Sequence, residues 1–549
     1  MHFIEFKEKG IKIEVEEGTS ILAAARKAGV MVEAPCNGAG VCGKCRIKKA
    51  GIEPLSAVEI KKEIDDDHVL ACQTLIRGDV TVSLEENKET GLEIVSEGKS
   101  LEFTFDLNVR KEYEPEKDRT AVWVGDNAPV YEEGNTEDAL FGVVVDIGTT
   151  TLVAALMDMH TGKELASASA LNPQARYGQD VLSRIHMASE EEGLNTLYSE
   201  VISEISRMTE EICKEAGKKR ENIYEIILSG NTCMIHLATG TSPKGLGSYP
   251  YIPNTRGGAA IKASDIRLDI AEEGLAYLPP IISAYVGPDI TSGILVSELP
   301  KKTGITLFVD IGTNGEMAIA RDGEICAAST AAGPAFEGMN IEFGMRAAKG
   351  AGEYFDITET GITVKTIGGS KAEGICGSGL LDIVGELVRT GVIGKNGRFV
   401  KKEKASLPEF LSERLQEYHE KTGFLVAEEV FLTQKDIRQV QLAKGAVRSG
   451  IEFLMKQQGI TAGEVDRVLI AGSFGFHLRS ESLINIGMLP REFEGKIEYV
   501  GNTSKTGGAA FLLNRGFREE ALDMVSKIKT IELADDPDFE KVFVECLNF

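Results

Sequence analysis

The sequence is poor in basic side chains, in cysteine and in long apolar runs. Its 60 lysine and arginine residues face 85 aspartate and glutamate residues, so the net charge is −25 at pH 7. This balance argues against electrostatic attachment to the phosphates of nucleic acid or of anionic lipid. No apolar stretch reaches the roughly 20 residues of a membrane helix, and residues 1–10 lack the apolar core of a signal peptide. We therefore expect a soluble, cytoplasmic protein that binds neither nucleic acid nor membrane.

Nine cysteines are too few to hold a chain of 549 residues together as a disulfide scaffold. Their distribution is uneven, because four of the nine lie between Cys36 and Cys72. The chain is also several times longer than a typical domain of about 100–200 residues. We therefore expect more than one domain, with a special role for the segment that holds the four cysteines.

Residues 1–85 have the pattern of a small, self-contained α+β unit. Apolar residues in partial alternation predict strands over 3–6 and 11–15. Strong helix formers predict a helix over 21–28, and the apolar run 80–84 predicts a closing strand. The unit is therefore expected to fold on its own.

Residues 86–140 are predicted to be a linker followed by a short middle segment. The first part is rich in charge and glycine. An apolar run predicts a strand over 101–107, and polar, acidic sequence around the single tryptophan, Trp123, follows it. The fold of residues 101–140 is left open.

From residue 141 onward, apolar strands that end in glycine-rich loops alternate with segments of helical period, which is typical of α/β architecture. The turn Asp146–Thr149 (DIGT) returns at Asp310–Thr313, 164 residues later, and an apolar strand follows each copy. Such an internal repeat predicts two similar lobes, about 141–300 and 301–549, that face each other.

Three of the clustered cysteines share one tight, glycine-rich loop, and the fourth follows 27 positions later. The four are Cys36, Cys42, Cys45 and Cys72. An iron–sulfur cluster needs four converging thiolates, and small residues let the backbone curl around it. A structural zinc site is the alternative, but zinc sites more often pair two CxxC knuckles. The spacing favours the iron–sulfur cluster, and the segment resembles the plant- and adrenal-type [2Fe-2S] ferredoxins with their β-grasp fold. The other cysteines are expected to be ordinary core residues.

Each DIGT turn combines a carboxylate, a glycine that permits close backbone approach and a hydroxyl that can bind phosphate. The carboxylates suit Mg²⁺, usually through its water molecules. A single DIGT turn is weak evidence, but two copies that face each other across a cleft predict a phosphate clamp.

Further segments occur in a recognisable order around the two turns. Residues 284–293 precede the second turn, residues 436–455 have a helical pattern, and residues 468–475 form a strand that runs into a small-residue loop. Residues 507–510 add a small-residue segment near the end. The set resembles the superfamily of sugar and acetate kinases, actin and the heat-shock chaperone ATPases. The resemblance implies a two-lobed α/β, actin-like (ribonuclease H-like) ATPase domain over residues 141–549.

The same resemblance implies roles for individual residues. Asp146 and Asp310 would be catalytic carboxylates. The two phosphate loops would comprise Gly148, Thr149 and Thr150 on one side and Gly312, Thr313 and Asn314 on the other. The adenosine would lie against Gly472, Ser473, Gln441 and Lys444. From its helical spacing alone, Lys444 could equally be a solvated cation.

Three other loops carry polar or glycine-rich sequence. Asn231 follows an apolar strand, where it could orient water against the terminal phosphate or simply cap the next helix. The glycines of 374–379 could receive a phosphate at a helix start or allow tight packing. Residues 172–180 precede a predicted helix that Asp180 could cap, and no chemical role follows from their sequence.

A one-electron cluster fused to an ATPase closely resembles the reductive activators of corrinoid proteins. The stretches that carry this resemblance are 146–151 (DIGTTT), 171–185 (LNPQARYGQDVLSRI), 283–295 (SAYVGPDITSGIL), 331–338 (AAGPAFEG), 374–379 (GICGSG) and 441–446 (QLAKGA). The resemblance implies a [2Fe-2S] cluster, ATP and Mg²⁺ as cofactors, an upstream electron donor, and a corrinoid protein whose Co(II) is reduced to Co(I). It is also compatible with a homodimer formed through the ATPase domain. The segment before the ATPase is shorter here than the middle domain of some members, which leaves the docking surface open.

Two other functions fit part of the same sequence. The chain could be a ferredoxin-type electron carrier with a regulatory nucleotide-binding domain, or a small-molecule kinase of the same superfamily. A kinase would need a substrate pocket with an aspartate base and would not explain the fused cysteine segment.

Overall fold

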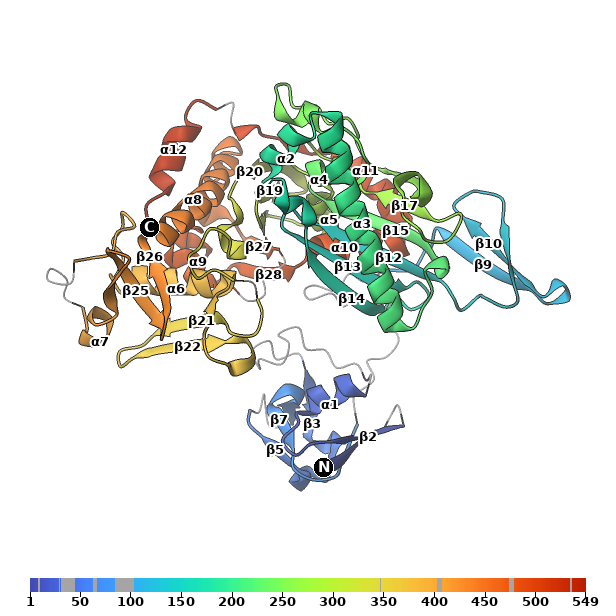
Figure 1. The fold of residues 1–549 in the computed structure, drawn as a ribbon, viewed down its shortest axis with the longest axis horizontal. Helices are drawn as coiled ribbons and strands as arrows, with labels where there is room; N and C mark the ends of the chain where they lie inside the picture. The colour runs from blue at the N-terminus through green and yellow to red at the C-terminus, as the bar shows by residue number, and fades with distance from the viewer. Residues whose placement is uncertain are drawn as a thin grey trace. The chain divides into compact units, whose positions relative to one another are not determined.

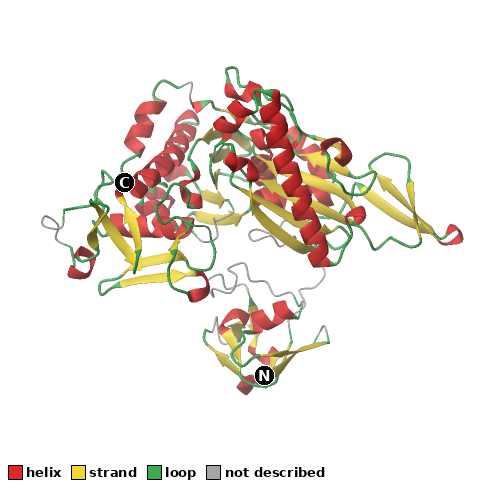
Figure 2. Cartoon of the chain, viewed as in Figure 1, coloured by secondary structure: helices red, strands yellow, loops and turns green. Residues whose placement is uncertain are grey.

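The computed structural model describes residues 1–7, 10–28, 30, 45–62, 67–83, 103–178, 180–345, 347–401, 407–472, 478–533 and 536–549. The chain divides into two compact units, residues 1–98 and 99–549 (Figure 1). Strands and helices are mixed in both units (Figure 2).

The first unit is the small α+β fold that the sequence predicts. Strand β1 (His2–Phe6) pairs antiparallel with β2 (Ile11–Val15) and parallel with β8 (Val80–Val82), and β4 (Ile52–Glu53) completes the sheet. Helix α1 (Ile21–Lys27) contributes buried residues to the core beneath this sheet. The remaining strands form two short ladders, β3 (Arg46–Lys48) with β6 (His68–Leu70) and β5 (Val58–Ile60) with β7 (Thr74–Ile76).

The segment that follows the linker folds as part of the second unit. Strands β9 (Val109–Glu114), β10 (Arg119–Val124) and β11 (Val130–Glu133) form an antiparallel sheet. The strand predicted over 101–107 is wrong for its described part, since residues 103–107 make only one isolated bridge. Phe103 instead packs edge-on against Phe517, with ring centroids 5.1 Å apart, so its aromatic side chain is partly buried without strand pairing.

The two halves of the second unit are built around two six-stranded sheets that match in five strands. In each, three consecutive antiparallel strands are joined by a parallel strand beside the first. One sheet has β14 (Glu164–Leu171), β13 (Thr151–Asp158), β12 (Phe141–Ile147), β15 (Ile223–Gly230), β17 (Leu275–Leu278) and β16 (Ala259–Lys262). The other has β28 (Ile497–Gly501), β27 (Arg467–Ala471), β18 (Ile305–Ile311), β19 (Gly315–Arg321), β20 (Glu324–Thr330) and β29 (Lys529–Thr530). The sixth strand, β16 or β29, lies at opposite edges of the two sheets, so the repeated turn marks a fold that is repeated in five strands.

Helices cover both faces of the first sheet. Alternate residues of β12 point to opposite sides, so Val143 joins the core under α3 (Glu191–Ala216) while Val144 faces Gly508 of α10. Helix α10 (Thr503–Leu513) thus comes late in the chain but packs on β12 and β15. It also packs on α5 (Pro288–Val296), and this helix pair joins the two halves.

Helices of the second half complete the layers. Helix α8 (Gln434–Gln457) packs on β19 and β20, and α6 (Gly377–Arg389) packs on β21 (Ala351–Ile357). The shorter helices are α2 (Val181–Met187), α4 (Thr232–Ala238), α7 (Glu409–Ser412), α9 (Ser480–Asn485), α11 (Gly516–Lys527) and α12 (Phe539–Cys546). Small sheets add β22 (Ile362–Thr366) and β23 (Gly374–Ile375) beside β21, and the meander β24 (Leu415–Tyr418), β25 (Lys421–Ala427), β26 (Val430–Thr433).

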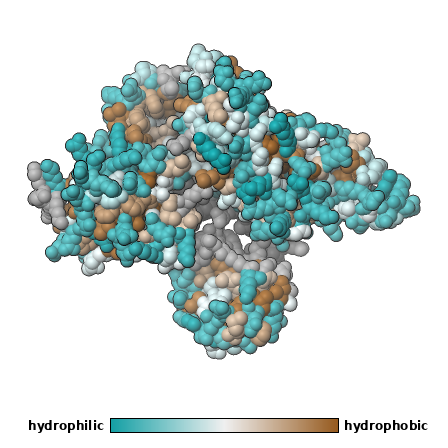
Figure 3. All heavy atoms as spheres, in the orientation of Figure 1, coloured by the Kyte–Doolittle hydropathy of each residue, from teal (hydrophilic) through white to brown (hydrophobic). Residues whose placement is uncertain are grey.

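Hydrophilic residues predominate on the viewed face of the second unit (Figure 3). Among the described helices, none combines the length and apolar character that a membrane crossing requires.

Candidate functional site

The two repeated turns meet at a common cavity between the halves of the second unit. Strands β12 and β18 each end in a DIGT turn, and the hydroxyl oxygens of Thr150 and Thr313 lie 3.0 Å apart. The cavity has a volume of about 120 Å³. The predicted site residues that line it are Asp146, Gly148, Thr149, Thr150, Asn231, Asp310, Gly312, Thr313, Asn314 and Gly472. Residues 164 positions apart in the sequence therefore form one site.

Glycines allow the neighbouring parallel strands to approach the turns. Gly472 has a φ of 119°, and a side chain there would lie 2.6 Å from the carbonyl oxygen of Ile311. Gly230 repeats the arrangement in the first half, with a φ of 155° and a contact of 2.5 Å with the carbonyl oxygen of Ile147. Because L-residues rarely adopt such φ values, both positions need glycine. By this equivalence Asn231 is the counterpart of Ser473, which lies outside the described residues.

Asn231 has the helix-capping role that its sequence allowed, whereas its role toward a water molecule stays a prediction. Its side-chain oxygen accepts a hydrogen bond from the backbone of Met234 at 3.0 Å and caps α4. Its amide nitrogen donates to the hydroxyl of Thr149 at 2.9 Å. The helix cap therefore holds the amide group against the first phosphate loop.

Five carboxyl groups, from Asp146, Asp289, Asp310, Glu316 and Glu337, line the same cavity, and the first four have raised pKa values. Burial raises the pKa of Asp310 well above its usual range, and the charges of Asp289 and Asp146 add to the effect. Burial also raises the pKa of Asp146, that of Glu316 and that of Asp289, the last to about 7. Four crowded carboxylates are costly to ionise together, so the site favours a ligand that brings positive charge.

The donor chemistry of this site fits Mg²⁺ bound largely through water. Oxygen ligands suit Mg²⁺, which keeps much of its hydration shell. Across the described ranges, no three His, Cys, Asp or Glu side chains stand close enough together to hold a metal directly. Asn502 of the α10 cap donates to Asp146 at 2.8 Å and orients that carboxylate. Direct coordination by a protein cage is thus not the arrangement that these residues support.

We expect Mg²⁺ to raise the melting temperature of the full chain more at pH 8 than at pH 5.5, by roughly 2–4 °C. A carboxyl group whose pKa is higher in the folded than in the unfolded protein lowers stability when it ionises. For Asp289 this loss begins near the unfolded pKa of 3.8, grows as the pH rises and is complete above about 7. A bound cation offsets the loss only where the carboxylates are ionised.

Thermal denaturation with and without Mg²⁺, at matched ionic strength, measures this difference. The substitution Asp289→Asn should reduce the difference between the two pH values. The control Glu324→Gln, at the exposed start of β20, should leave it unchanged. An equal Mg²⁺ effect at both pH values would contradict the expectation.

Gln441 and Lys444 lie on α8, where the C-terminal residues of the chain cover them. The amide of Gln441 donates to the carbonyl oxygen of Leu547 at 2.9 Å, and the ammonium of Lys444 donates to that of Asn548. The Lys444 ammonium also lies 5.3 Å from the ring centroid of Phe549. Lys444 is therefore not a solvated cation, and the contact of both residues with adenosine stays a prediction.

The glycine-rich segment 374–379 is closely packed rather than open to a ligand. A side chain at Gly377 would lie 1.8 Å from the carbonyl oxygen of Phe336, and one at Gly379 would lie 2.0 Å from that of Gly352. These contacts support the packing alternative for the segment.

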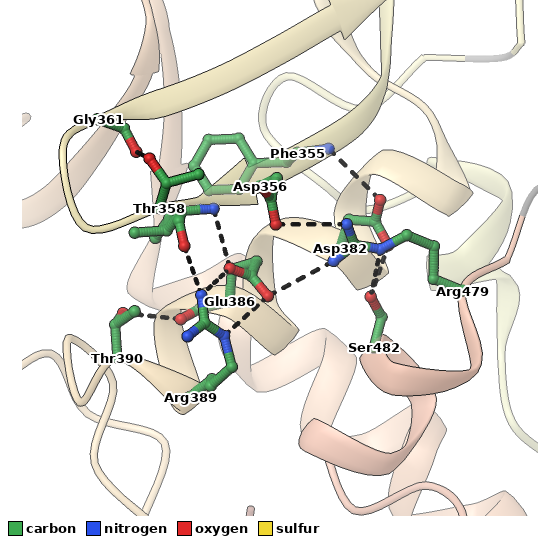
Figure 4. A network of polar contacts seen from close by, with 11 residues as sticks. Phe355, Asp356, Thr358, Gly361, Asp382, Glu386, Arg389, Thr390, Arg479 and Ser482 are labelled. Carbon is green, nitrogen blue, oxygen red and sulfur yellow. Dashed lines mark hydrogen bonds and ion pairs between the residues drawn. The ribbon is translucent and has the colours of Figure 1, made fainter. Parts of the chain in front are cut away.

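An ion-pair network ties α6 to the segment that follows residues 473–477. The guanidinium of Arg479 lies 3.3 Å from Asp382 and 3.5 Å from Glu386, both on α6, as Figure 4 shows. The hydroxyl of Ser482 also donates to Asp382 at 2.6 Å. The network anchors the chain just beyond the predicted adenosine loop.

In the first unit, the two described members of the cysteine set converge. The sulfur atoms of Cys45 and Cys72 are 3.3 Å apart, and both side chains are buried. Cys36 and Cys42 lie outside the described residues. Two converging buried thiols from positions 27 apart fit the ligand set of a small cluster.

Sequence reasoning missed several residues of the cavity. Asp289 and Glu337 lie inside stretches that carried the family resemblance, yet no role was assigned to them. Glu337 accepts a hydrogen bond from the hydroxyl of Thr313 at 2.5 Å. Glu316 follows the second turn directly, so its position was a usable signal. Asn502 had no such signal, because only the fold brings it to Asp146.

Three family profiles match the chain in succession. The 2Fe-2S iron-sulfur cluster binding domain matches residues 4–77, the RACo middle region matches 141–302, and the C-terminal domain of RACo, the ASKHA domain, matches 304–549. The last two together include both halves of the cavity.

Similar proteins extend the match to nearly the whole chain. The corrinoid activation enzyme RamQ of Eubacterium limosum is 29% identical, with 97% of this chain and 96% of RamQ covered. The [Co(II) methylated amine-specific corrinoid protein] reductase of Methanosarcina barkeri is 23% identical over 71% of this chain and 73% of its own. The solved structure of a reductive activator for corrinoid, iron-sulfur protein superposes with a TM-score of 0.76 at 29% identity, covering 100% of this chain and 98% of that one. The three family profiles and the two matches over nearly the whole chain agree. This chain therefore belongs to the RACo family of reductive activators of corrinoid proteins.

Proposed function

We propose that this protein is an ATP-dependent reductive activator that passes one electron to a corrinoid protein and converts its inactive Co(II) into Co(I). The observation that carries the proposal is the similarity to a corrinoid activation enzyme over 97% of the chain, which includes both the cysteine unit and the two-lobed unit. A ferredoxin-type unit and a nucleotide cleft in one chain are the parts that such a reaction needs.

The cysteines of the first unit would hold the redox centre. Cys45 and Cys72 already lie together, and Cys36 and Cys42 complete the predicted set. A [2Fe-2S] cluster, when bound, supplies one electron at a time, usually at low potential. The overall balance is one electron taken from an upstream donor for each cobalt reduced. The burial of the two described sulfurs limits the access of water to their side of the site.

The second unit would bind the nucleotide between its lobes. The carboxylates of Asp146 and Asp310 would hold Mg²⁺ through water, and Mg²⁺ would offset the charge of the phosphates. A cavity of about 120 Å³ is smaller than the roughly 300–1,000 Å³ of most small-molecule sites. The contact between Thr150 and Thr313 must therefore open for ATP to enter. Binding would then favour one lobe arrangement over another.

A change of lobe arrangement on nucleotide binding could supply the free energy that the electron transfer requires. Co(I) is a strong reductant, so electron transfer to Co(II) from a ferredoxin-type centre is uphill. A nucleotide can drive a conformational change only through different affinities for two arrangements. The arrangement with Thr150 and Thr313 in contact would be one of these two, and the arrangement opened by the nucleotide would be the other. A homodimer through this unit remains a prediction.

Removal of the chain from Leu547 onward is expected to lower the Kd for a non-hydrolysable ATP analogue about threefold to tenfold. If Gln441 and Lys444 contact the adenosine, these tail residues must first leave, and their two hydrogen bonds to Gln441 and Lys444 must break. Titration calorimetry on the full and shortened chains measures the change. Val544→Ala, on the exposed side of α12, is the control. An unchanged or weaker affinity of the shortened chain for the analogue would contradict a contact of Gln441 and Lys444 with the adenosine.

Anaerobic measurement of phosphate release tests the proposed function against its two alternatives. We expect release from ATP to rise when a candidate corrinoid protein is added, and no sugar to be phosphorylated. Phosphorylation of a sugar would support the kinase, whereas cobalt reduction with no ATP turnover would support the electron carrier.

A further inference from the structure

The polar segment that precedes and begins α2 forms hydrogen bonds with the first phosphate loop. Three consecutive carbonyl groups of the loop accept hydrogen bonds from residues of this segment. The carbonyl oxygen of Gly148 accepts from the side-chain amide of Asn172 at 2.8 Å, and that of Thr149 accepts from the guanidinium of Arg184 at 2.6 Å. The carbonyl oxygen of Thr150 accepts from the backbone N–H of Asn172 at 2.8 Å. Both Asn172 and Arg184 are 0% exposed.

These contacts decide which way the loop amides point. In a trans peptide unit the C=O and N–H groups point in opposite directions. With the carbonyls of Gly148 and Thr149 turned toward Asn172 and Arg184, the N–H groups of Thr149 and Thr150 point away from that segment. Thr149 and Thr150 line the cavity. The loop is therefore set to present N–H groups to a ligand in the cavity.

Arg184 is a buried cation whose hydrogen-bond acceptors carry no charge. Besides Thr149, its guanidinium donates to the carbonyl oxygen of Gly178 at 2.9 Å, the side-chain oxygen of Gln174 at 3.2 Å and the sulfur of Met234 at 3.2 Å. Burial lowers the pKa of Arg184 to about 10, so it stays charged at neutral pH. The charges of Asp180 and Glu337 act on Arg184 from a distance, but no carboxylate among the described residues accepts its hydrogen bonds, so a further anion in the cavity would be favourable.

The second loop lacks this arrangement. The residue equivalent to Thr149 is Thr313, and its carbonyl oxygen accepts from the backbone N–H of Gly333 at 2.7 Å. The carbonyl group at this position of the turn is thus bound by a neutral backbone N–H in the second half and by a guanidinium in the first. The cation is not required by the turn itself.

We propose that Arg184, with Asn172, is a positioning residue for the nucleotide phosphates: it fixes the peptide units of the first loop with their N–H groups toward the cavity and places a positive charge behind them. The inference rests on nucleotide binding at these loops, as proposed above. It gives a role to the polar segment 172–184 that its sequence alone did not suggest. Asp180 caps α2 through Ser183 and fixes the start of the helix that carries Arg184.

The test compares the full-length holoprotein with the variants Arg184→Met and Arg184→Lys, using a non-hydrolysable ATP analogue with Mg²⁺. We expect the Kd to rise about tenfold or more in Arg184→Met and about threefold in Arg184→Lys, whose ammonium keeps the charge but has one donor nitrogen in place of three. Each Kd is measured well below the melting temperature of its variant, so that the folded fraction is equal. This partial recovery by lysine is a result that a merely structural role would not produce.

Arg518→Met is the control, because Arg518 is a largely buried arginine, 12% exposed, that pairs with Glu225 at 2.7 Å, away from the loops. It should lower the melting temperature and leave the Kd within twofold. A folded Arg184→Met with the parent Kd, or an Arg184→Lys no better than Arg184→Met, would overturn the inference. If Arg184→Met does not fold, Arg184→Lys with the parent Kd would still overturn it. A parent protein that does not bind the analogue would instead refute the proposed nucleotide site.

Discussion

Replacement of Cys72 by alanine is expected to abolish the visible absorbance of the cluster, and electron transfer with it. The buried sulfur of Cys72 lies 3.3 Å from that of Cys45, so its loss removes one of the two converging thiols that are predicted to be ligands. A [2Fe-2S] cluster needs all four thiolates. Nucleotide binding should be unchanged, because the phosphate loops belong to the other compact unit.

Iron and sulfide analysis of the purified variant, with its absorbance spectrum, measures this effect. Cys213→Ala is the matched control, since Cys213 is a buried cysteine of α3 in the other unit. The control should keep the parent iron content. A Cys72→Ala variant with the parent iron and sulfide content would exclude Cys72 as a ligand, and zinc in the parent protein would favour the alternative site.

Replacement of Asp310 by asparagine is expected to lower the rate of the proposed ATP hydrolysis by about 10²–10³-fold, a loss typical of removing one electrostatic group from an active site. Asp310 lies at the end of β18 and lines the cavity beside Asp289 and Asp146. Its carboxylate would hold hydrated Mg²⁺ against the phosphates, and the neutral amide cannot replace that charge. The substitution keeps the shape of the side chain.

The same substitution is expected to stabilise the protein without nucleotide. Burial and the neighbouring carboxylates raise the pKa of Asp310, so its charge is unfavourable in the folded state. An amide removes that repulsion, and the melting temperature at pH 8 should rise while activity falls. Glu324→Gln, an exposed carboxylate on the same sheet, should change neither. Undiminished phosphate release by the Asp310→Asn variant would show that Asp310 is not needed for hydrolysis.

Local patterns predicted the parts of the site that repeat in the sequence. The two DIGT turns end equivalent strands, so their residues share one cavity, and the ferredoxin-like unit has its predicted strands and helix. The strand expected over 101–107 failed because Phe103 packs against Phe517, which lies more than 400 residues later. Local periodicity contains no information about such a partner.

The remaining site residues depend on tertiary contacts. Asn502 reaches Asp146 only because α10 packs on β12, and Gln441 and Lys444 are covered by the end of the chain. The segment 172–184 looked merely polar, and its relation to the first loop emerged from the hydrogen bonds to Gly148 and Thr149. Residue types suggested the kind of site, whereas only the fold determined which residues come together in it.

The coupling of nucleotide to electron transfer is tested most directly by the anaerobic conversion of Co(II) to Co(I) in a candidate corrinoid protein. The absorbance change is followed with the holoprotein and an upstream reductant, in the presence and absence of Mg²⁺ and ATP. The proposed function predicts conversion with ATP and little or none without it, and no conversion by the Cys72→Ala variant under either condition. Conversion at the same rate without ATP would contradict it.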